Sequence, residues 1–111
     1  MKIAVAFDKE TENITENLSD TIYFMIYEFD GNAFTNVELV STMGKSEFEL
    51  AEILSMMEVD LLICGNMEPV TEQSFDDEGI QVFSSIYGSS DEAVFSYMTG
   101  RELKYRNSDL V

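Results

Sequence analysis

The single cysteine of the chain, Cys64, is the first residue whose chemistry could define a site. A thiolate binds soft metals and metal-sulfur clusters. Cys64 ends the apolar run 61–64, and ligands of open α/β sheets bind just beyond the carboxyl ends of such strands. Cys64 is therefore a candidate metal or cofactor ligand. The alternative is a small buried apolar residue, which is what most free cysteines are.

Asp8 is a second candidate, for a divalent metal, because it directly follows the apolar run 2–7. Carboxylate clusters bind hard cations, and metal-dependent hydrolases use them. The other acids that could join such a cluster are Asp20, Asp60 and Glu68. The alternative is that these acids lie apart on the surface, since a chain with 6 basic residues has little with which to hold a polyanionic substrate.

The loop 65–69 joins the strand that ends at Cys64 to a predicted helix. The backbone amides of Gly65 and Asn66 could hold an anion at the helix N-terminus, and Pro69 suits the first helical position. The loop has too few glycines for a phosphate cradle of the Walker or dinucleotide type. The alternative is an ordinary turn between a strand and a helix.

The chain contains no histidine. This excludes every histidine-dependent catalytic dyad or triad and every histidine-ligated metal site. We therefore predict no catalytic residues and a protein that is not an enzyme.

Composition indicates one folded, acidic domain. The 111 residues suit a single domain, and an apolar content of 45% excludes a disordered acidic tail. The net charge of -16, from 22 acidic and 6 basic residues, repels phosphate groups, so neither nucleic acids nor membranes are expected partners. A protein partner with a basic surface fits this charge better, whereas the oligomeric state stays open.

The expected location is the cytoplasm. One cysteine excludes an internal disulfide, and no apolar run is long enough to span a bilayer. The first residues are typical of a strand and contain no signal-peptide cleavage site.

Hydrophobic periodicity predicts the elements that must position these residues. Strands are expected at 2–7, 22–29, 34–40, 61–64 and 80–83, and helices after Ser46, from Pro69 to Gly79 and from Ser89 to Gly100. Residues 9–20 are expected to be a loop, and 30–32 a hairpin turn. Two capping boxes, Ser46–Glu49 and Ser89–Glu92, would begin the first and third helices.

The resulting order, β-β-β-α-β-α-β-α, predicts a mixed α/β sheet. The early strands would pair antiparallel, and the later strands would be parallel through right-handed crossovers. We expect one domain over residues 1–103 and a polar C-terminal tail over 104–111.

Four segments, in order and spacing, resemble a known family. Residues 17–27 resemble a block written His-Phe-Gly-Arg, two residues, then Tyr-Phe and a hydrophobic strand, and residues 59–69 resemble a block with Val-Asp, an apolar strand, Gly-Asn and Gly-Pro. Residues 79–83 are similar to Gly-Ile-Lys-Val-Tyr, and 88–93 to Gly-Thr-Val-Glu-Glu-Ala. The family is the dinitrogenase iron-molybdenum cofactor biosynthesis proteins, which include the orange-protein type, and the resemblance spans residues 2–103.

The resemblance implies a ribonuclease-H-like α/β fold with a five-stranded mixed sheet and three helices, and a relation to nitrogen fixation. The cofactor role of the first block falls on Asn17 and Ser19, and these two residues with Cys64, Gly65 and Asn66 make up the candidate cofactor-binding set. The histidine and arginine that the family uses to hold an anionic metal-sulfur cofactor are absent, since Asn17 and Asp20 stand in their places. Exchanging a cation for an anion at this point favours repulsion of an anionic cluster.

These observations favour a non-enzymatic, divergent family member that acts as a binding or interaction module. The first alternative is a carrier of an iron-molybdenum or other metal-sulfur cluster that uses Cys64. The second is a divalent-metal hydrolase built on Asp8 and neighbouring carboxylates.

Overall fold

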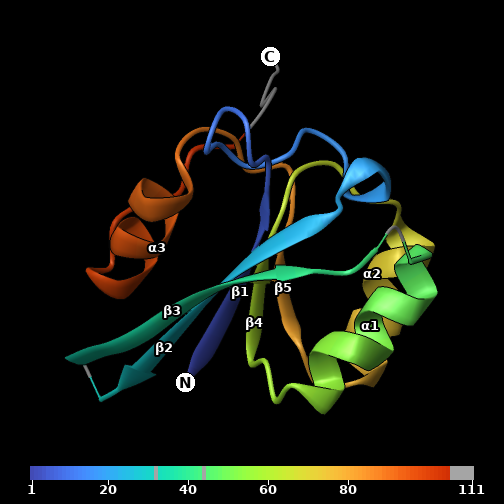
Figure 1. Cartoon of the computed structure of the whole chain (residues 1–111), viewed down its shortest axis with the longest axis horizontal. Coiled ribbons are helices and arrows are strands. Elements are labelled where there is room, and N and C mark those ends of the chain that lie inside the picture. The colour runs from blue at the N-terminus through green and yellow to red at the C-terminus, as the bar shows by residue number, and fades with distance from the viewer. Residues whose placement is uncertain (32, 44, 106–111) are drawn as a thin grey trace.

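The computed structural model describes residues 1–31, 33–43 and 45–105 as one mixed sheet with helices on both faces (Figure 1). The strands are β1 (Lys2–Phe7), β2 (Tyr23–Asp30), β3 (Ala33–Ser41), β4 (Leu61–Ile63) and β5 (Gln81–Phe83), and they lie in the order β3-β2-β1-β4-β5. The helices are α1 (Glu47–Met56), α2 (Pro69–Asp77) and α3 (Ser90–Met98). The predicted five-stranded mixed sheet and three helices are confirmed, whereas the name ribonuclease-H-like stays a prediction.

Strand β1 is the centre of the sheet. It pairs antiparallel with β2 and parallel with β4, so the expected mixture of antiparallel and parallel pairing is present. Residues 3–6 have no exposed surface, because both edges of the strand are hydrogen-bonded and both faces are covered. A strand buried on both faces has a continuous apolar sequence rather than an alternating one.

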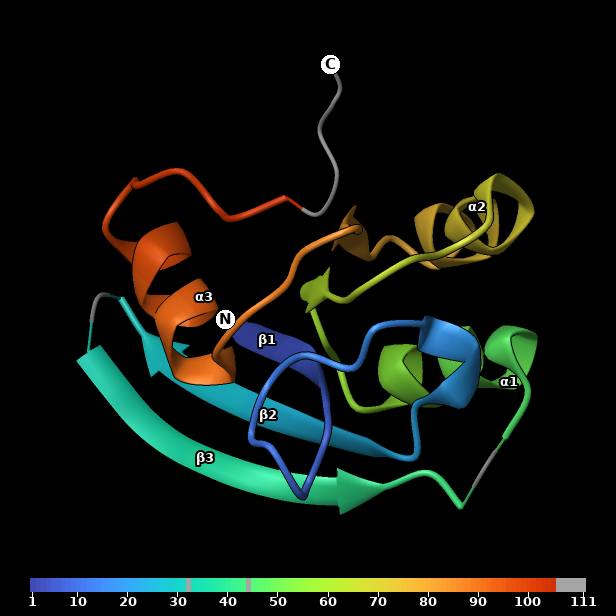
Figure 2. The ribbon, with the colours of Figure 1, turned by 90° about the horizontal axis from the view of Figure 1, so that it is seen from above.

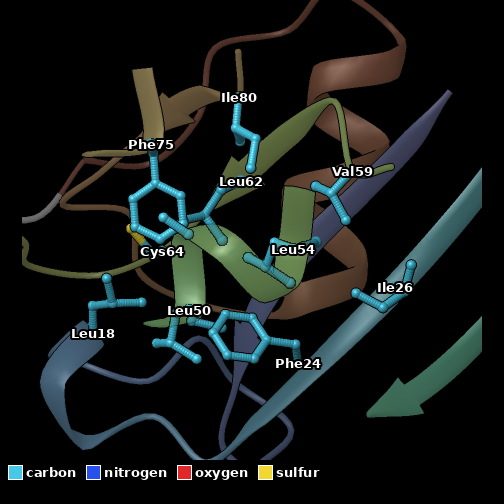
Figure 3. Close-up of a cluster of buried hydrophobic side chains, with 13 residues drawn as sticks. Leu18, Phe24, Ile26, Leu50, Leu54, Val59, Leu62, Cys64, Phe75 and Ile80 are labelled. Carbon is cyan, nitrogen blue, oxygen red and sulfur yellow. The ribbon is translucent and has the colours of Figure 1, made fainter. Parts of the chain in front are cut away.

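Two hydrophobic cores lie on opposite faces of the sheet. Alternate β1 residues serve each core, with Ala4 and Ala6 on one face and Ile3 and Val5 on the other. Figure 3 shows the first core, in which side chains from the sheet meet those of α1 and α2. The second core includes the inner face of α3, which Figure 2 shows on the other side of the sheet.

Part of the predicted loop 9–20 is more ordered than its polar composition indicates. Leu18–Asp20 form a short 3-10 helix, and Ile14 makes an isolated bridge with Phe7. Ile14 and Leu18 are buried, one in each core, and burial of these two apolar side chains holds the segment against the end of the sheet. In the predicted turn, Gly31 has a φ of 65°, which glycine adopts at no steric cost, and Asn32 lies outside the described residues.

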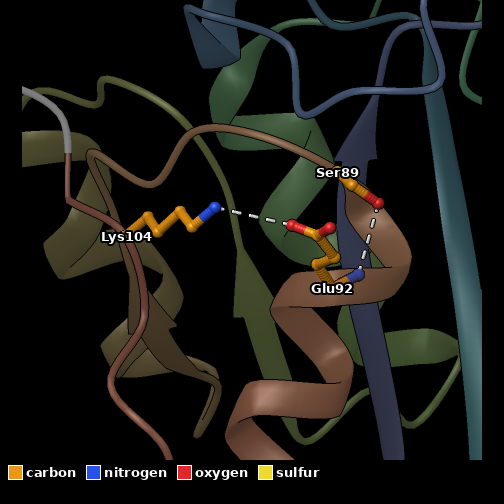
Figure 4. A network of polar contacts seen from close by, with 3 residues as sticks. All are labelled: Ser89, Glu92 and Lys104. Carbon is orange, nitrogen blue, oxygen red and sulfur yellow. Dashed lines mark hydrogen bonds and ion pairs between the residues drawn. The ribbon is translucent and has the colours of Figure 1, made fainter.

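The two predicted helix caps differ. Ser46 and Glu49 form the complete capping box, and the Ser46 backbone bond lowers the pKa of Glu49. At α3, the Ser89 side chain accepts a hydrogen bond from the Glu92 backbone, but Glu92 Oε1 lies 3.6 Å from Lys104 Nζ (Figure 4). Among the described contacts, the second predicted box therefore has the hydrogen bond to the Ser89 side chain. The Glu92 carboxylate forms an ion pair with Lys104, in the segment that follows α3.

The described end of the chain is held against the domain. Tyr87 donates its backbone N–H to Lys104 O at 3.0 Å, and Tyr105 forms a bridge with Ile86. The predicted tail, 104–111, thus begins with paired residues, and its positions 106–111 lie outside the described residues. None of the helices in the described segments is long and apolar enough to cross a bilayer.

The first core predicts different costs for two truncations on α1. Leu54 is fully buried, so Leu54→Ala should lower the free energy of unfolding by about 3 kcal/mol through lost burial and a residual cavity. Met56 is 82% exposed, and Met56→Ala should change the same quantity by less than about 0.5 kcal/mol. Urea denaturation monitored by circular dichroism measures both. Equal losses would mean that α1 is not packed on the sheet as described.

Candidate functional site

Two loops meet at the carboxyl ends of the central strands, where the resemblance places a cofactor site. Asn17 forms a parallel bridge with Asn66, and Asn66 Nδ2 donates to Asn17 Oδ1 at 3.3 Å. The backbone closes the same contact, since Leu18 N donates to Asn66 O at 3.0 Å and Asn66 N donates to Glu16 O at 2.7 Å. Asn17 and Asn66, distant in sequence, are therefore neighbours, and their amide groups bond to each other.

Gly65 makes this contact possible. A Cβ atom at this position would lie 2.2 Å from Glu16 O and 2.3 Å from Thr15 O, and both are backbone atoms. Any side chain would therefore push the two loops apart. Glycine is required here for close approach of backbones, which gives Gly65 a structural role at the predicted site.

The side chains around this contact carry negative charge. Ser19 and Asp20 are exposed on the 3-10 helix, and Glu16 is exposed just before Asn17. Glu68 occupies the N-cap of α2 and makes no side-chain capping bond. Residues 16–20 contain two acids and no basic residue, so the potential at this surface opposes binding of an anion.

Cys64 faces the first core rather than the loop surface. Its exposed fraction is 0%, and Figure 3 shows it among the packed side chains of that core. Burial raises the pKa of the thiol to about 12, and the charges of Glu72 and Glu47 act in the same direction. A thiol enclosed in this core is out of reach of a metal at the loop surface, and burial disfavours the thiolate that would bind one. The geometry therefore favours the alternative interpretation of Cys64 as a small buried residue.

Asp8 does not lie near one of its predicted partners. Its Oδ1 accepts a hydrogen bond from Glu10 N at 2.9 Å in the turn after β1. Asp60 Oδ2 accepts from Lys2 N at 2.9 Å, at the opposite end of the same strand. The predicted cluster of Asp8 with Asp60 is wrong, because the parallel crossover brings Asp60 to the start of β1. The residues that the structure describes contain no group of three or more acids, cysteines or histidines that could hold a metal ion.

The residues at the predicted cofactor site do not fit an anionic metal-sulfur cluster. The available donors are two amides that bond to each other, an exposed hydroxyl, carboxylates and backbone groups. None of these side chains is a soft ligand, and the carboxylates repel an anion.

The sequence did not predict an apolar groove between α3 and the β2–β3 hairpin. The groove has a volume of about 730 Å³ and is lined by Tyr27, Phe29, Phe34, Val37, Asp91, Val94, Phe95, Met98 and Thr99. The signal available in the sequence was the second set of apolar residues on α3, Val94, Phe95 and Met98, beside the alternating apolar residues of β3. Periodicity alone does not show which of these residues a neighbouring element covers.

Comparison with known proteins identifies the family. Residues 1–100 match the family model described as "Dinitrogenase iron-molybdenum cofactor", so the chain belongs to this family. No curated protein matches the chain.

Solved structures share the fold at low sequence identity. The protein PH0822 is 18% identical, with a TM-score of 0.88 over 97% of this chain and 96% of that one. The apo form of the orange protein from Desulfovibrio gigas is 18% identical, with a TM-score of 0.76 over 94% and 91% of the two chains. The protein TM1290 from Thermotoga is 21% identical, with a TM-score of 0.72 over 99% and 97%. These likenesses concern the fold.

The buried thiol predicts a pH dependence of stability. The unfolded thiol ionises near its ordinary pKa of 9.0, whereas the folded thiol keeps its proton up to about pH 12. The stability contribution is therefore complete below about pH 9 and is lost as pH rises toward 12, by up to about 1.4 kcal/mol per pH unit. The wild-type free energy of unfolding should thus fall more steeply over this range than that of Cys64→Ala.

Urea denaturation at several pH values measures the two slopes. The comparison isolates one group, because Tyr27, whose pKa is also raised by burial, is present in both proteins. Equal slopes would show that the Cys64 thiol is exposed to solvent.

Proposed function

We propose that the chain is a non-enzymatic, divergent member of its family that acts as a protein-interaction module, and that its partner has a basic surface. One observation carries the proposal. At the position where the family resemblance has a histidine and an arginine, this chain has an asparagine whose amide bonds to Asn66, and an exposed aspartate, Asp20. The side chains of Asn17 and Asn66 hold the two loops together, and residues 16–20 contain no basic side chain to bind an anion.

The charge of the chain supports a basic partner. With a net charge of -16, its field steers cationic surfaces toward it and repels anionic ones. The proposal therefore expects neither nucleic acids nor membranes as partners, and it expects the cytoplasm as the location. We also expect, from the family resemblance, that the fold is ribonuclease-H-like.

A carrier of an iron-molybdenum or other metal-sulfur cluster is the second candidate function, and membership of the family favours it. This function requires that Cys64, or ligands outside the loop contact, hold the metal. It would also require the first core to open, since the Cys64 side chain is enclosed there.

Restoring the family's side chains tests the proposal. The double variant Asn17→His/Asp20→Arg should gain binding of iron and molybdenum when incubated anaerobically with ferrous iron, molybdate and sulfide, because it supplies a nitrogen ligand and replaces an anion by a cation. The wild type should show no metal above a buffer blank after desalting. Metal analysis by mass spectrometry measures both.

The hairpin offers a matched control. Asn36→His/Asp30→Arg makes the same chemical change on β3 and β2, away from the loop contact, and should remain at the level of the wild type. Wild-type protein that loads as much metal as the Asn17→His/Asp20→Arg variant would contradict the proposal and favour the carrier.

A further inference from the structure

The two faces of the sheet are covered unequally. Figures 1 and 2 show α1 and α2 together on one side of the sheet and α3 on the other. On the side of α3, the outer strand β3 keeps large apolar side chains in solvent. Phe34 is 56% exposed and Val37 is 44% exposed, although both lie beside the buried β2 residues Tyr27 and Phe29. The second core is therefore continuous with exposed apolar surface.

Helix α3 contributes the other wall of the groove. Its lining residues Asp91, Val94, Phe95 and Met98 follow the spacing i, i+3, i+4 and i+7. Residues at this spacing form one face of a helix. Val94 and Met98 pack into the second core, whereas Asp91 and Phe95, one turn apart, are exposed. Phe95 on this face is 56% exposed, so the face extends beyond the contact of α3 with the sheet.

A fixed negative charge lies in the wall of the groove. Tyr27 donates its hydroxyl hydrogen to Asp91 Oδ1 at 2.6 Å, and the same hydroxyl lies 2.8 Å from Ser90 Oγ. Burial raises the pKa of Tyr27, so the phenol keeps the proton that it donates to the carboxylate oxygen. Asp91 is itself exposed and is the charged member of the groove lining, so it is available to a cation from outside.

Charge decides between the possible occupants. A second copy of this chain would bring a net charge of -16 against the same charge, and a repulsion of this size opposes association. A segment with an apolar stripe flanked by lysine or arginine complements both the apolar walls and Asp91. One wall is a helix that exposes Asp91 and Phe95 one turn apart, and the other is a strand that exposes Phe34 and Val37, so an extended amphipathic helix is the shape that contacts both.

We propose that the groove between α3 and the β2–β3 hairpin binds one amphipathic helix of a basic protein partner. The apolar stripe of that helix contacts Phe34, Val37 and Phe95, and a basic side chain next to the stripe pairs with Asp91. This inference rests on the proposed function and adds to it the surface and the kind of segment that is recognised.

A synthetic peptide of leucine and lysine, patterned as an amphipathic helix about five turns long, is the probe. The full chain should bind it at physiological ionic strength, as measured by fluorescence anisotropy, and should bind a scrambled peptide of the same composition at least about tenfold more weakly. Amide chemical-shift changes in NMR spectra should fall on β2, β3 and α3.

Two phenylalanines on different faces form a matched pair of variants. Phe95 on α3 is 56% exposed and Phe48 on α1 is 58% exposed, so the two substitutions to glutamate add the same charge at similar exposure. Phe95→Glu also removes the contact of the Arg101 guanidinium with the Phe95 ring. Phe95→Glu should weaken peptide binding at least about tenfold, and Phe48→Glu by less than about twofold. Circular dichroism and melting temperature verify that both variants are folded.

The outcomes separate the inference from the proposed function. Binding that Phe95→Glu and Phe48→Glu weaken equally, or shifts that fall on α1 and α2, would overturn the groove as the site and leave a basic partner possible elsewhere. Wild-type dimers that Phe95→Glu dissociates, seen by sedimentation, would overturn the inference in favour of a second copy. Failure of every cationic peptide to bind would overturn both.

Discussion

Complete burial of β1 is the constraint on which the rest of the molecule depends. Residues 3–6 of this strand have no exposed surface, and residues 3–5 pair with β2 on one edge and with β4 on the other. Ala4 and Ala6 are small, and the first core combines them with large side chains such as Phe24 and Phe75, as close packing requires. The hairpin, the parallel crossover and the helices on both faces all follow from enclosing this one strand.

The loop contact at the top of the sheet depends on the same strand. The chain leaves β1 at Phe7 and returns so that Thr15 and Glu16 meet Gly65, which follows β4, the parallel neighbour of β1. The contact leaves no room for a side chain at Gly65 and pairs Asn17 with Asn66. A place that the family resemblance assigns to a cofactor is thus used here to join two loops.

The sheet and helices could be predicted from the sequence because hydrophobic periodicity, helix caps and turn residues are local signals. The Ser46–Glu49 box is an example. The burial of Cys64 and the groove could not be predicted, since a short apolar run does not show which face of the sheet a side chain takes. The groove is lined by β3 and α3, which are far apart in sequence, so periodicity within either segment does not predict that they lie side by side. The expected proximity of Asp60 to Asp8 was wrong because Asp60 precedes β4 and Asp8 follows β1. In parallel strands, these two positions lie at opposite ends of the strands.

We propose that this family member recognises a protein and does not carry a metal-sulfur cluster. The most direct measurement is the content of iron, molybdenum, copper and acid-labile sulfide in wild-type protein isolated anaerobically from cells. We expect values no higher than those of a blank purification, because the loop surface is anionic and the Cys64 thiol is enclosed. Near-stoichiometric metal with sulfide, lost on Cys64→Ala in protein that remains folded, would contradict it and identify a cofactor carrier.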